Sequence, residues 1–339
     1  MALITGAMWD IETALTVHYP SPDMLFASGQ AYGWAVVAPG NVWADTAGTT
    51  PGVVDATIRR LDDERGAPWI GATTGPTLRN TGGVYWLEFA QTDGRQLQIT
   101  VPAITNGTLL LAHKNAGVMS GNVTIPAGTY SVGRWDINGI VGMLLINRNL
   151  SQVEREQVRQ WFITERGAGV FSSVTDFSRF GRERKLVSVD LFDTSQGTNF
   201  FEFLYANKLT SVPLFDTSSG TSFFGFLYFN NLTSIPLFDT SAGTSFQNFC
   251  SENATLTTVP AGLFNDVKGT NFTNVFFNCA LTQASVDNVL VSVAVAAAAN
   301  NLNNGTLTGL NSGTNAAPSA TGVTAKNELI ARGWTVTTF

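Results

Sequence analysis

The chain has 339 residues, of which 44% are hydrophobic and 13% are charged, and its formal net charge is −6. This length allows two domains with proper cores, and the apolar content argues for a folded protein rather than a disordered one. The acidic balance excludes a nucleic-acid role, because neutralising phosphate groups requires clustered lysine and arginine.

The first segment, residues 1–20, has no evident core of its own. It lacks a basic region and a sustained apolar run, so we expect no secretory signal and assign it to attachment or to contacts between subunits. The densest apolar run of the chain is 286–299. It is shorter than the ~18 residues needed to cross a bilayer, so we expect a buried helix there and no membrane insertion.

Residues 21–148 are predicted to form short strands between turns. Segments such as GGVYWLEFA, RQLQITVPAI and GTLLLAHK are rich in β-branched and aromatic residues and are bounded by Gly, Asn and Pro. This pattern is typical of a sandwich or barrel. A helix is expected over 150–165, where Ser151 and Glu154 are spaced as a capping box. Glu154 and Glu156 are better explained as a solvated helix face than as an acid–base pair.

The composition changes near residue 170. Seven of the eight tryptophans precede residue 162, whereas nineteen of the twenty-three phenylalanines lie between Phe171 and Phe277. Two differently built cores explain this better than one. We therefore place a boundary within 165–173, between a domain over 21–168 and a domain over 169–339.

Several stretches of the first domain carry a family resemblance. VWADTAGTTPGVVDATIRRLDDERG and VYWLEFAQTDGRQLQI resemble the start of lectin-like modules in phage and prophage tail proteins. GIVGMLLINRNLSQVEREQVRQWF resembles the closing strand and helix of the same concanavalin A-like fold. The resemblance covers 22–165 and implies a mainly-β jelly-roll sandwich closed by the helix. No sugar or calcium ligand is carried over to this sequence.

The second domain repeats itself with a period of 23 residues. Three copies begin at Leu186, Leu209 and Leu232, and a fourth and a fifth begin at Leu256 and Leu281 after insertions of one and two residues. The L-x-x-L-x-L spacing within a copy is a leucine-rich signature, and it predicts a strand with Leu209, Val212 and Leu214 pointing inward. The spacing of Phe223 and Phe226 predicts one helical turn packed against that strand.

The motif FDTS, followed by T/S-x-x-F and then LTS, resembles the BspA-type leucine-rich repeat of bacterial surface proteins and phage tail fibres. The resemblance implies a mixed fold in which the sandwich is followed by an α/β leucine-rich-repeat solenoid of 4–5 copies. Its predicted parts are an N-terminal cap over 171–185, repeats over 186–280 and a C-terminal cap over 281–339. The last piece, 323–336, is expected to be a helix, a glycine stop and a strand.

Two polar columns recur in the repeats. They are Asp193, Asp216 and Asp239, and Asn207, Asn230 and Asn253. Asp followed by Thr-Ser is typical of a turn that binds its own backbone N–H groups, and stacked Asn side chains can cap backbone groups between turns. Carboxylates one repeat apart would lie about 5 Å from each other, which also suits a retaining glycoside hydrolase, so that alternative stays open.

Other chemistry finds little support in the sequence. His18 and His113 are far apart and have no metal-ligand spacing, and Cys250 and Cys279 are expected to be packed thiols in a protein made in a reducing cytoplasm. We predict no catalytic residue, no metal site and no cofactor.

A binding face is predicted on the outside of the repeats. Its hydroxyl part consists of Thr210, Ser211, Thr233 and Ser234, continued by Thr257 and Thr258. Its aromatic part consists of Tyr205, Tyr228 and Phe229. Hydroxyls beside aromatic rings suit glycans, since sugars offer OH groups and apolar faces together.

These resemblances imply a phage or phage-derived tail fibre, a receptor-binding protein that adheres to the host cell surface without enzymatic activity. Such a protein would be made in the bacterial host cytoplasm and would reside in the virion tail. Its expected partners are a host cell-surface glycan or protein, other tail or baseplate proteins, and further copies of itself, in a trimer by resemblance. The alternatives are a polysaccharide-depolymerising tail spike and a bacterial surface adhesin.

Overall fold

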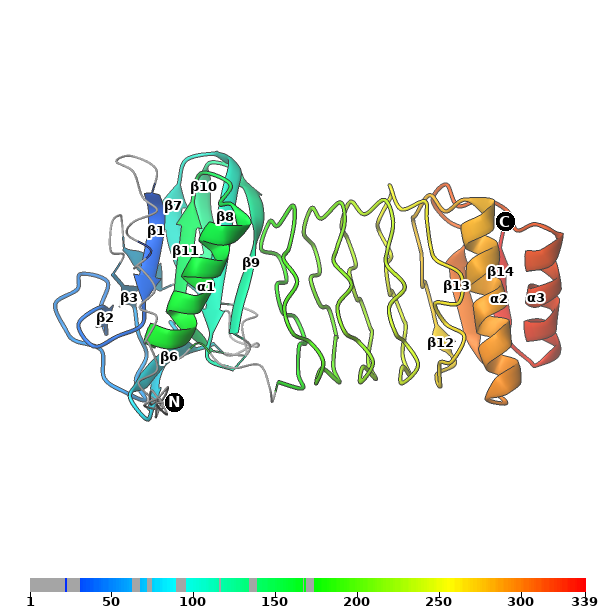
Figure 1. Cartoon of the computed structure of the whole chain (residues 1–339), viewed down its shortest axis with the longest axis horizontal. Helices are drawn as coiled ribbons and strands as arrows, with labels where there is room; N and C mark the ends of the chain where they lie inside the picture. The colour runs from blue at the N-terminus through cyan, green and yellow to red at the C-terminus, as the bar shows by residue number, and fades with distance from the viewer. Residues whose placement is uncertain are drawn as a thin grey trace, which may run out of the picture.

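The computed structural model describes most of the chain. The described residues are 31–62, 68–71, 75–89, 96–115, 117–133, 139–166 and 174–339, with Pro22 and Ala168. The predicted attachment segment 1–20 and most of the predicted boundary 165–173 lie outside them. The molecule is elongated, with β-sheets at one end, a stack of coils in the middle and a helical region at the other end (Figure 1).

The described N-terminal half contains two antiparallel sheets. The first has the order β5-β6-β11-β8-β9, with β1 also paired to β11, and the second has the order β10-β7-β4-β3-β2. The strands of the first sheet are β1 (Ala31–Val36), β5 (Thr77–Thr81), β6 (Val84–Glu88), β8 (Ile104–His113), β9 (Gly117–Ile125) and β11 (Ile140–Ile146). Those of the second are β2 (Val42–Trp43), β3 (Arg60–Leu61), β4 (Trp69–Gly71), β7 (Leu97–Val101) and β10 (Gly128–Val132).

The first sheet is buried on both faces, which explains the almost continuous apolar run of β8. Alternate residues of a strand point to opposite faces. Leu109 belongs to the cluster that includes Ile99 of the second sheet, whereas Leu110 belongs to a cluster with Phe162 of helix α1 (Gln152–Arg166). Helix α1 therefore covers the outer face of this sheet, as Figure 1 shows.

Helix α1 confirms the helix predicted over 150–165 and its capping box. The Ser151 backbone N–H donates to Glu154 Oε2 at 2.8 Å, and the Glu154 N–H donates to Ser151 Oγ at 3.3 Å. Two backbone donors that the first helical turn leaves without partners are thereby satisfied.

Residues 174–280, which we call the coil stack, run in successive coils of one repeat each. The far end is closed by a parallel sheet of β12 (Asn271–Phe272), β13 (Thr306–Leu310) and β14 (Thr335–Thr338), together with α2 (Gln283–Ala299) and α3 (Ala320–Ala331). Helix α2 confirms the buried helix predicted over 286–299. Helix α3, Gly333 at φ +81° and β14 confirm the helix, glycine stop and strand predicted at the C-terminal end.

The predicted jelly roll followed by an α/β leucine-rich-repeat solenoid is wrong. The described chain is mainly antiparallel sheet with three helices, and residues 174–282, all described, contain no helix. Neighbouring coils are joined by isolated parallel bridges, such as Asn199↔Ser222, rather than by one strand per copy. The repeat predicts the stacking of copies but not the backbone conformation within each copy.

The physical reason lies in residues 200–206. Glu202, Leu204 and Ala206 have φ between +52° and +54°, and an α-helix cannot continue through left-handed residues. Their N–H groups bond to other coils instead of four residues back. Glu202 N–H donates to the Phe224 carbonyl of the next coil at 2.7 Å, and Leu204 N–H donates to the Phe180 carbonyl of the preceding coil at 2.9 Å.

The predicted inward strand is also partly wrong. Leu209 is buried and Val212 is partly buried, but Leu214 is 58% exposed and Phe215 is 1% exposed in its place. The Phe215 N–H donates to the Pro213 carbonyl at 3.0 Å, which closes a three-residue turn around Leu214. This turn breaks the two-residue alternation on which the prediction relied.

Stacked aromatic rings fill the coil stack. One column consists of Phe177, Phe200, Phe223, Phe246 and Phe272, and the other of Phe180, Phe203, Phe226 and Phe249. Within the first column, consecutive ring centroids lie 4.9–5.7 Å apart with the planes nearly parallel. All nine side chains are at most 2% exposed, so the inward positions of the phenylalanines were predicted correctly although the helical turn was not.

The asparagine column caps the backbone between coils, as predicted. Asn230 is 4% exposed, and its Nδ2 donates to the carbonyl of Leu227 in its own coil at 3.1 Å and to that of Leu204 in the preceding coil at 3.0 Å. Its Oδ1 accepts from the Leu209 N–H at 3.2 Å. One buried side chain therefore satisfies three backbone groups that have no regular ladder around them.

The coil stack is joined to the first sheet along the edge strand β9. The N–H of Val187 donates to the Asn122 carbonyl at 2.8 Å, and the N–H of Asp190 donates to the Ser120 carbonyl at 2.9 Å. One cluster of buried apolar side chains runs from Ala35 in the sheets to Trp334 at the far end. The first coil thus covers an edge that would otherwise expose unpaired backbone groups.

Candidate functional site

Several hollows open on the described surface, and two of them exceed 500 Å³. One, of about 520 Å³, lies at the junction between helix α1, strand β9 and the first coil. The other, of about 590 Å³, lies on the coil stack. They differ in how many of their polar side chains already have hydrogen-bond or ion-pair partners within the chain.

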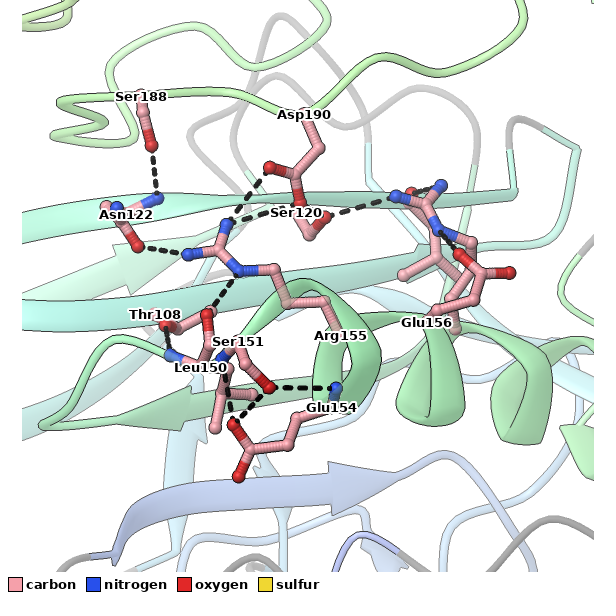
Figure 2. A network of polar contacts seen from close by, with 12 residues as sticks. Thr108, Ser120, Asn122, Leu150, Ser151, Glu154, Arg155, Glu156, Ser188 and Asp190 are labelled. Atoms are coloured by element: carbon pink, nitrogen blue, oxygen red, sulfur yellow. Dashed lines mark hydrogen bonds and ion pairs between the residues drawn. The ribbon is translucent and has the colours of Figure 1, made fainter.

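The junction hollow is built around Arg155, which is 7% exposed (Figure 2). Its Nε donates to the Leu150 carbonyl at 3.0 Å, its Nη1 contacts the Asp190 carboxylate at 3.1 Å, and its Nη2 donates to Asn122 Oδ1. Every guanidinium nitrogen therefore has a partner within the chain. Arg155 links the helix, the sheet edge and the first coil.

Arg159 beside it is committed in the same way. Its Nη1 donates to the Val118 carbonyl at 2.9 Å, its Nη2 donates to Ser120 Oγ at 3.1 Å, and its Nε lies 3.3 Å from the Glu156 carboxylate. An incoming anion would have to displace these contacts. The junction hollow is therefore best explained as part of the connection between the two regions.

The hollow on the coil stack has a different character. It is lined by Glu183, Lys185, Ala206, Asn207, Lys208, Phe229, Asn230, Asn231, Glu252, Ala254 and Asn278. We call this hollow, together with the adjacent Tyr205 and Tyr228, the aromatic groove. Its lining includes Asn207 and Asn230 of the asparagine column, whose side chains donate to backbone carbonyls of the coils.

The aromatic rings of the groove are held in fixed positions. Tyr205 and Tyr228 stack with their centroids 5.0 Å apart and their planes 4° apart. The ring centroid of Phe229 lies 6.3 Å from that of Tyr228, and the Phe229 side chain is 56% exposed. The guanidinium of Arg182 lies 4.3 Å from the centre of the Tyr205 ring. Cation–π and stacking contacts of this kind fix ring orientation before a ligand arrives.

The tyrosine hydroxyls remain protonated near neutral pH. Burial raises the pKa of Tyr205 and of Tyr228 above the ordinary value, and nearby carboxylates such as Glu252 raise it further. Each hydroxyl can therefore donate a hydrogen bond as well as accept one. A ligand with hydroxyl groups and an apolar face would match this surface.

The charged residues of the groove are divided along its length. Lys185 and Lys208 occupy equivalent positions in two successive repeats, and Glu183 precedes Lys185 by two residues. Glu252 lies three repeats after Glu183, at the other end of the groove. Glu252 accepts a hydrogen bond from Asn278 Nδ2 at 2.7 Å, and Glu183 pairs with Arg182 at 3.1 Å. The basic groups therefore lie toward the end of the groove that meets the sheets.

The predicted binding residues are only partly brought together. Phe229 lines the groove and Tyr228 contacts Phe229, while Tyr205 stacks on Tyr228. The predicted hydroxyl residues are exposed, but they do not line the groove; they are Thr210, Ser211, Thr233 and Ser234. The sequence reading missed Lys185 and Lys208, although their spacing of one repeat was available as a signal.

The aspartate column is used by its own turns. The Asp193, Asp216 and Asp239 carboxylates accept from the backbone N–H two residues later at 2.9–3.0 Å. Hydrogen bonds from Ser241 hold the pKa of Asp239 below its ordinary value. A general acid of a glycoside hydrolase needs a raised pKa, so Asp239 does not suit that role.

The two cysteines are buried free thiols, as predicted. Burial raises the pKa of Cys279 to about 12 and that of Cys250 well above its ordinary value. Within the described residues, no three side chains of the metal-ligating types come together. None of the described helices is both long and apolar enough to span a bilayer.

Comparison with known proteins adds no identification. No family model, no curated protein and no solved structure matches the chain.

Proposed function

We propose that this protein is a non-enzymatic receptor-binding protein that adheres to a host cell-surface glycan through the aromatic groove. One observation carries the proposal: two tyrosine rings stacked at 5.0 Å stand beside an exposed Phe229 at a hollow of about 590 Å³. Sugar rings present apolar C–H faces between hydroxyl groups, and a groove of aromatic and polar side chains complements both.

The coil stack supports this role through rigidity. Tyr205 and Tyr228 are positioned by coils whose backbones bond directly, since the Ala206 N–H donates to the Tyr228 carbonyl at 2.9 Å. The side chains that contact the ligand lose little conformational freedom on binding because their neighbours already restrict them. Weak contacts to single sugars can then add up along a polymer or over several copies.

The place of the protein in a virion is a proposal that rests on the sequence resemblance. Under it, the protein is a tail-fibre component made in the bacterial host cytoplasm, and residues 1–20 contact other tail or baseplate proteins. A trimer is proposed by the same resemblance. Several copies side by side would multiply a modest affinity for each glycan.

The test is a binding screen of the full-length protein on an array of microbial surface glycans. The wild type should bind one or more glycans, and the double variant Tyr228→Ser/Phe229→Ser should lose at least tenfold in signal. Leu214→Ser is the matched control, since Leu214 is 58% exposed, Phe229 is 56% exposed, and Leu214 lies outside the groove. Binding that survives in the double variant, or no binding by the wild type, would overturn the proposal.

A further inference from the structure

We propose that the ligand is an extended anionic polysaccharide, which crosses from the aromatic groove over Lys185 onto the edge of the second sheet. This inference rests on the proposed function and goes further in naming the charge and the path of the glycan. Two observations support it: two lysines of the aromatic groove have no ion-pair partner among the described residues, and a smaller hollow at the edge of the second sheet shares residues with the groove.

Two lysines give the groove exposed positive charge. Lys185 and Lys208 are both exposed and both line the groove. Among the described residues, neither ammonium group has an ion-pair or hydrogen-bond partner, whereas the lysine of the same stack outside the groove, Lys268, donates to Asn300 at 3.2 Å. Two unpaired cations one repeat apart would attract an anionic group of a ligand.

The carboxylates nearby do not cancel this attraction. Glu183 pairs with Arg182, and Glu202 pairs with both Arg182 and Arg179, so two carboxylates and two guanidinium groups form a charge-balanced cluster of their own. Glu252 stands at the other end of the groove and accepts from Asn278. An anionic substituent is therefore favoured at the end next to the sheets, while neutral hydroxyl groups suit the end near Glu252.

The second hollow gives the path. It has a volume of about 210 Å³ and is lined by Gln96, Thr129, Tyr130, Ser131, Glu183, Arg184 and Lys185. Glu183 and Lys185 line both hollows, so the two meet at these residues. Strand β10 supplies Thr129 and Ser131, whose hydroxyls and the Gln96 amide can bond sugar hydroxyls.

A polymer that follows this path would contact both regions of the molecule. The coils supply the aromatic rings and the lysines, and the sheet edge supplies neutral polar groups. A short oligosaccharide would fill only one hollow, so affinity should grow with chain length until both are occupied. The anionic group itself is either a carboxylate or a sulfate, because a lysine binds both as a point charge.

The experiment is affinity electrophoresis of the full-length protein in native gels that contain dextran, carboxymethyl-dextran or dextran sulfate. These polymers share a backbone and differ in charge. At least one anionic polymer should retard the wild type and dextran should not, although the protein itself carries a net charge of −6. Retardation should weaken as salt is added, since exposed ion pairs are screened. The anionic polymer with the stronger effect identifies carboxylate or sulfate as the preferred group.

Variants separate this site from general charge effects. Lys185→Gln/Lys208→Gln should weaken retardation at least tenfold, whereas Lys268→Gln, the matched control, should not. Thr129→Glu should weaken binding of long carboxymethyl-dextran but not of a short oligomer, whereas Thr210→Glu, an exposed hydroxyl outside both hollows, should change neither.

The outcomes also separate this inference from the proposed function. No retardation by either anionic polymer, or equal loss in the Lys268→Gln control, would overturn the anionic ligand. Equal effects of Thr129→Glu on long and short chains would overturn the path across the sheet edge. If the glycan array yields only neutral ligands that depend on Phe229, the inference fails and the proposed function stands.

Discussion

The sheets and the coil stack satisfy the same backbone requirements by different means. In the first sheet, β8 and β9 pair in register over most of their length, so the backbone bonds itself. In the coil stack, left-handed residues recur in successive coils, and much of the backbone bonds from coil to coil and to side chains such as Asn230. Regular sheet depends little on which polar side chains are present, whereas the coils depend on a few in each repeat.

The two parts of the continuous core differ in the same sense. The sheets are filled by aliphatic side chains of many shapes, such as Leu109 and Met143, while the coils are filled by phenylalanines that stack on their own equivalents. A stack of identical rings requires the same residue at the same position in each copy. This explains why the repeat is so regular in sequence where the sheets are not.

The largest expected effect comes from breaking a ring column. Phe223 is fully buried, and its ring centroid lies 5.6 Å from that of Phe200 and 5.4 Å from that of Phe246. Phe223→Ala should lower the free energy of unfolding by about 3–5 kcal/mol, the range for an emptied aromatic site in a core. Chemical denaturation measures the change, and Phe229→Ala is the exposed control. A loss under about 1 kcal/mol would mean that the columns do not support the coils.

Removing one asparagine should come next. Asn230→Ala leaves the Leu209 N–H without its partner in a buried site, while the carbonyls of Leu204 and Leu227 each keep one donor, from Asn207 and Asn253. We expect a loss of about 1–3 kcal/mol, the cost of one buried backbone donor left without a partner. Asn231→Ala, an exposed neighbour, should be nearly neutral in the same denaturation experiment. Equal effects of the two would contradict the capping role.

The contrast between the sheets and the coil stack also explains how much of the fold could be predicted from the sequence. The helix α1 and its cap could be predicted, because Ser151 and Glu154 act over one turn of chain. The inward phenylalanines could also be predicted from the period. The coil conformation could not, since Phe223 and Phe226 face inward at the same spacing in a helix and in a left-handed turn. The predicted register after Pro213 was wrong because the three-residue turn around Leu214 interrupts the alternation of inward and outward side chains.

The candidate site was predictable only in part, because some of its residues lie far apart in the sequence. Phe229 and the two tyrosines follow directly from the repeat, and Lys185 and Lys208 carry the same period. Thr129 of the second hollow lies on β10, and no local pattern relates it to the repeats. Only the folded arrangement brings that strand beside Lys185.

A glycine should show how tightly the rings pack. A Cβ at Gly220 would lie 2.5 Å from Phe223 Cζ and 2.9 Å from the Thr217 carbonyl oxygen. Gly220→Ala should therefore destabilise the protein by about 1–3 kcal/mol, as overpacked sites do. At Gly225 the nearest atom, Glu202 Cγ, is 3.4 Å away and φ is +64°, so Gly225→Ala reports backbone strain without the clash. A larger loss at Gly225 would mean that backbone strain, not ring contact, governs these positions.

The helix cap of the sheet region should give a smaller, pH-dependent effect. The hydrogen bond from Arg148, with those from Ser151, lowers the pKa of Glu154 from 4.5 to about 2. A lowered folded-state pKa means that the stabilisation is present above about pH 4.5 and is lost as the pH falls toward 2. Glu154→Gln should remove this part of the pH dependence of unfolding. The Glu156→Gln control should leave it in place, and an unchanged profile in Glu154→Gln would contradict the assignment.

The smallest effect is expected where the repeat is most conspicuous in sequence. Leu191, Leu214 and Leu237 recur at one position of each copy, yet they are 54–58% exposed. Leu214→Ala should change the free energy of unfolding by no more than about 0.5 kcal/mol, because little apolar area returns to water. Phe215→Ala, one residue later and 1% exposed, should cost about 3–5 kcal/mol. Chemical denaturation of the two variants in parallel decides the register of the coil. If Leu214→Ala were the more damaging of the pair, the turn at Pro213 would not direct Leu214 outward, and the inward strand predicted from the leucine spacing would be restored.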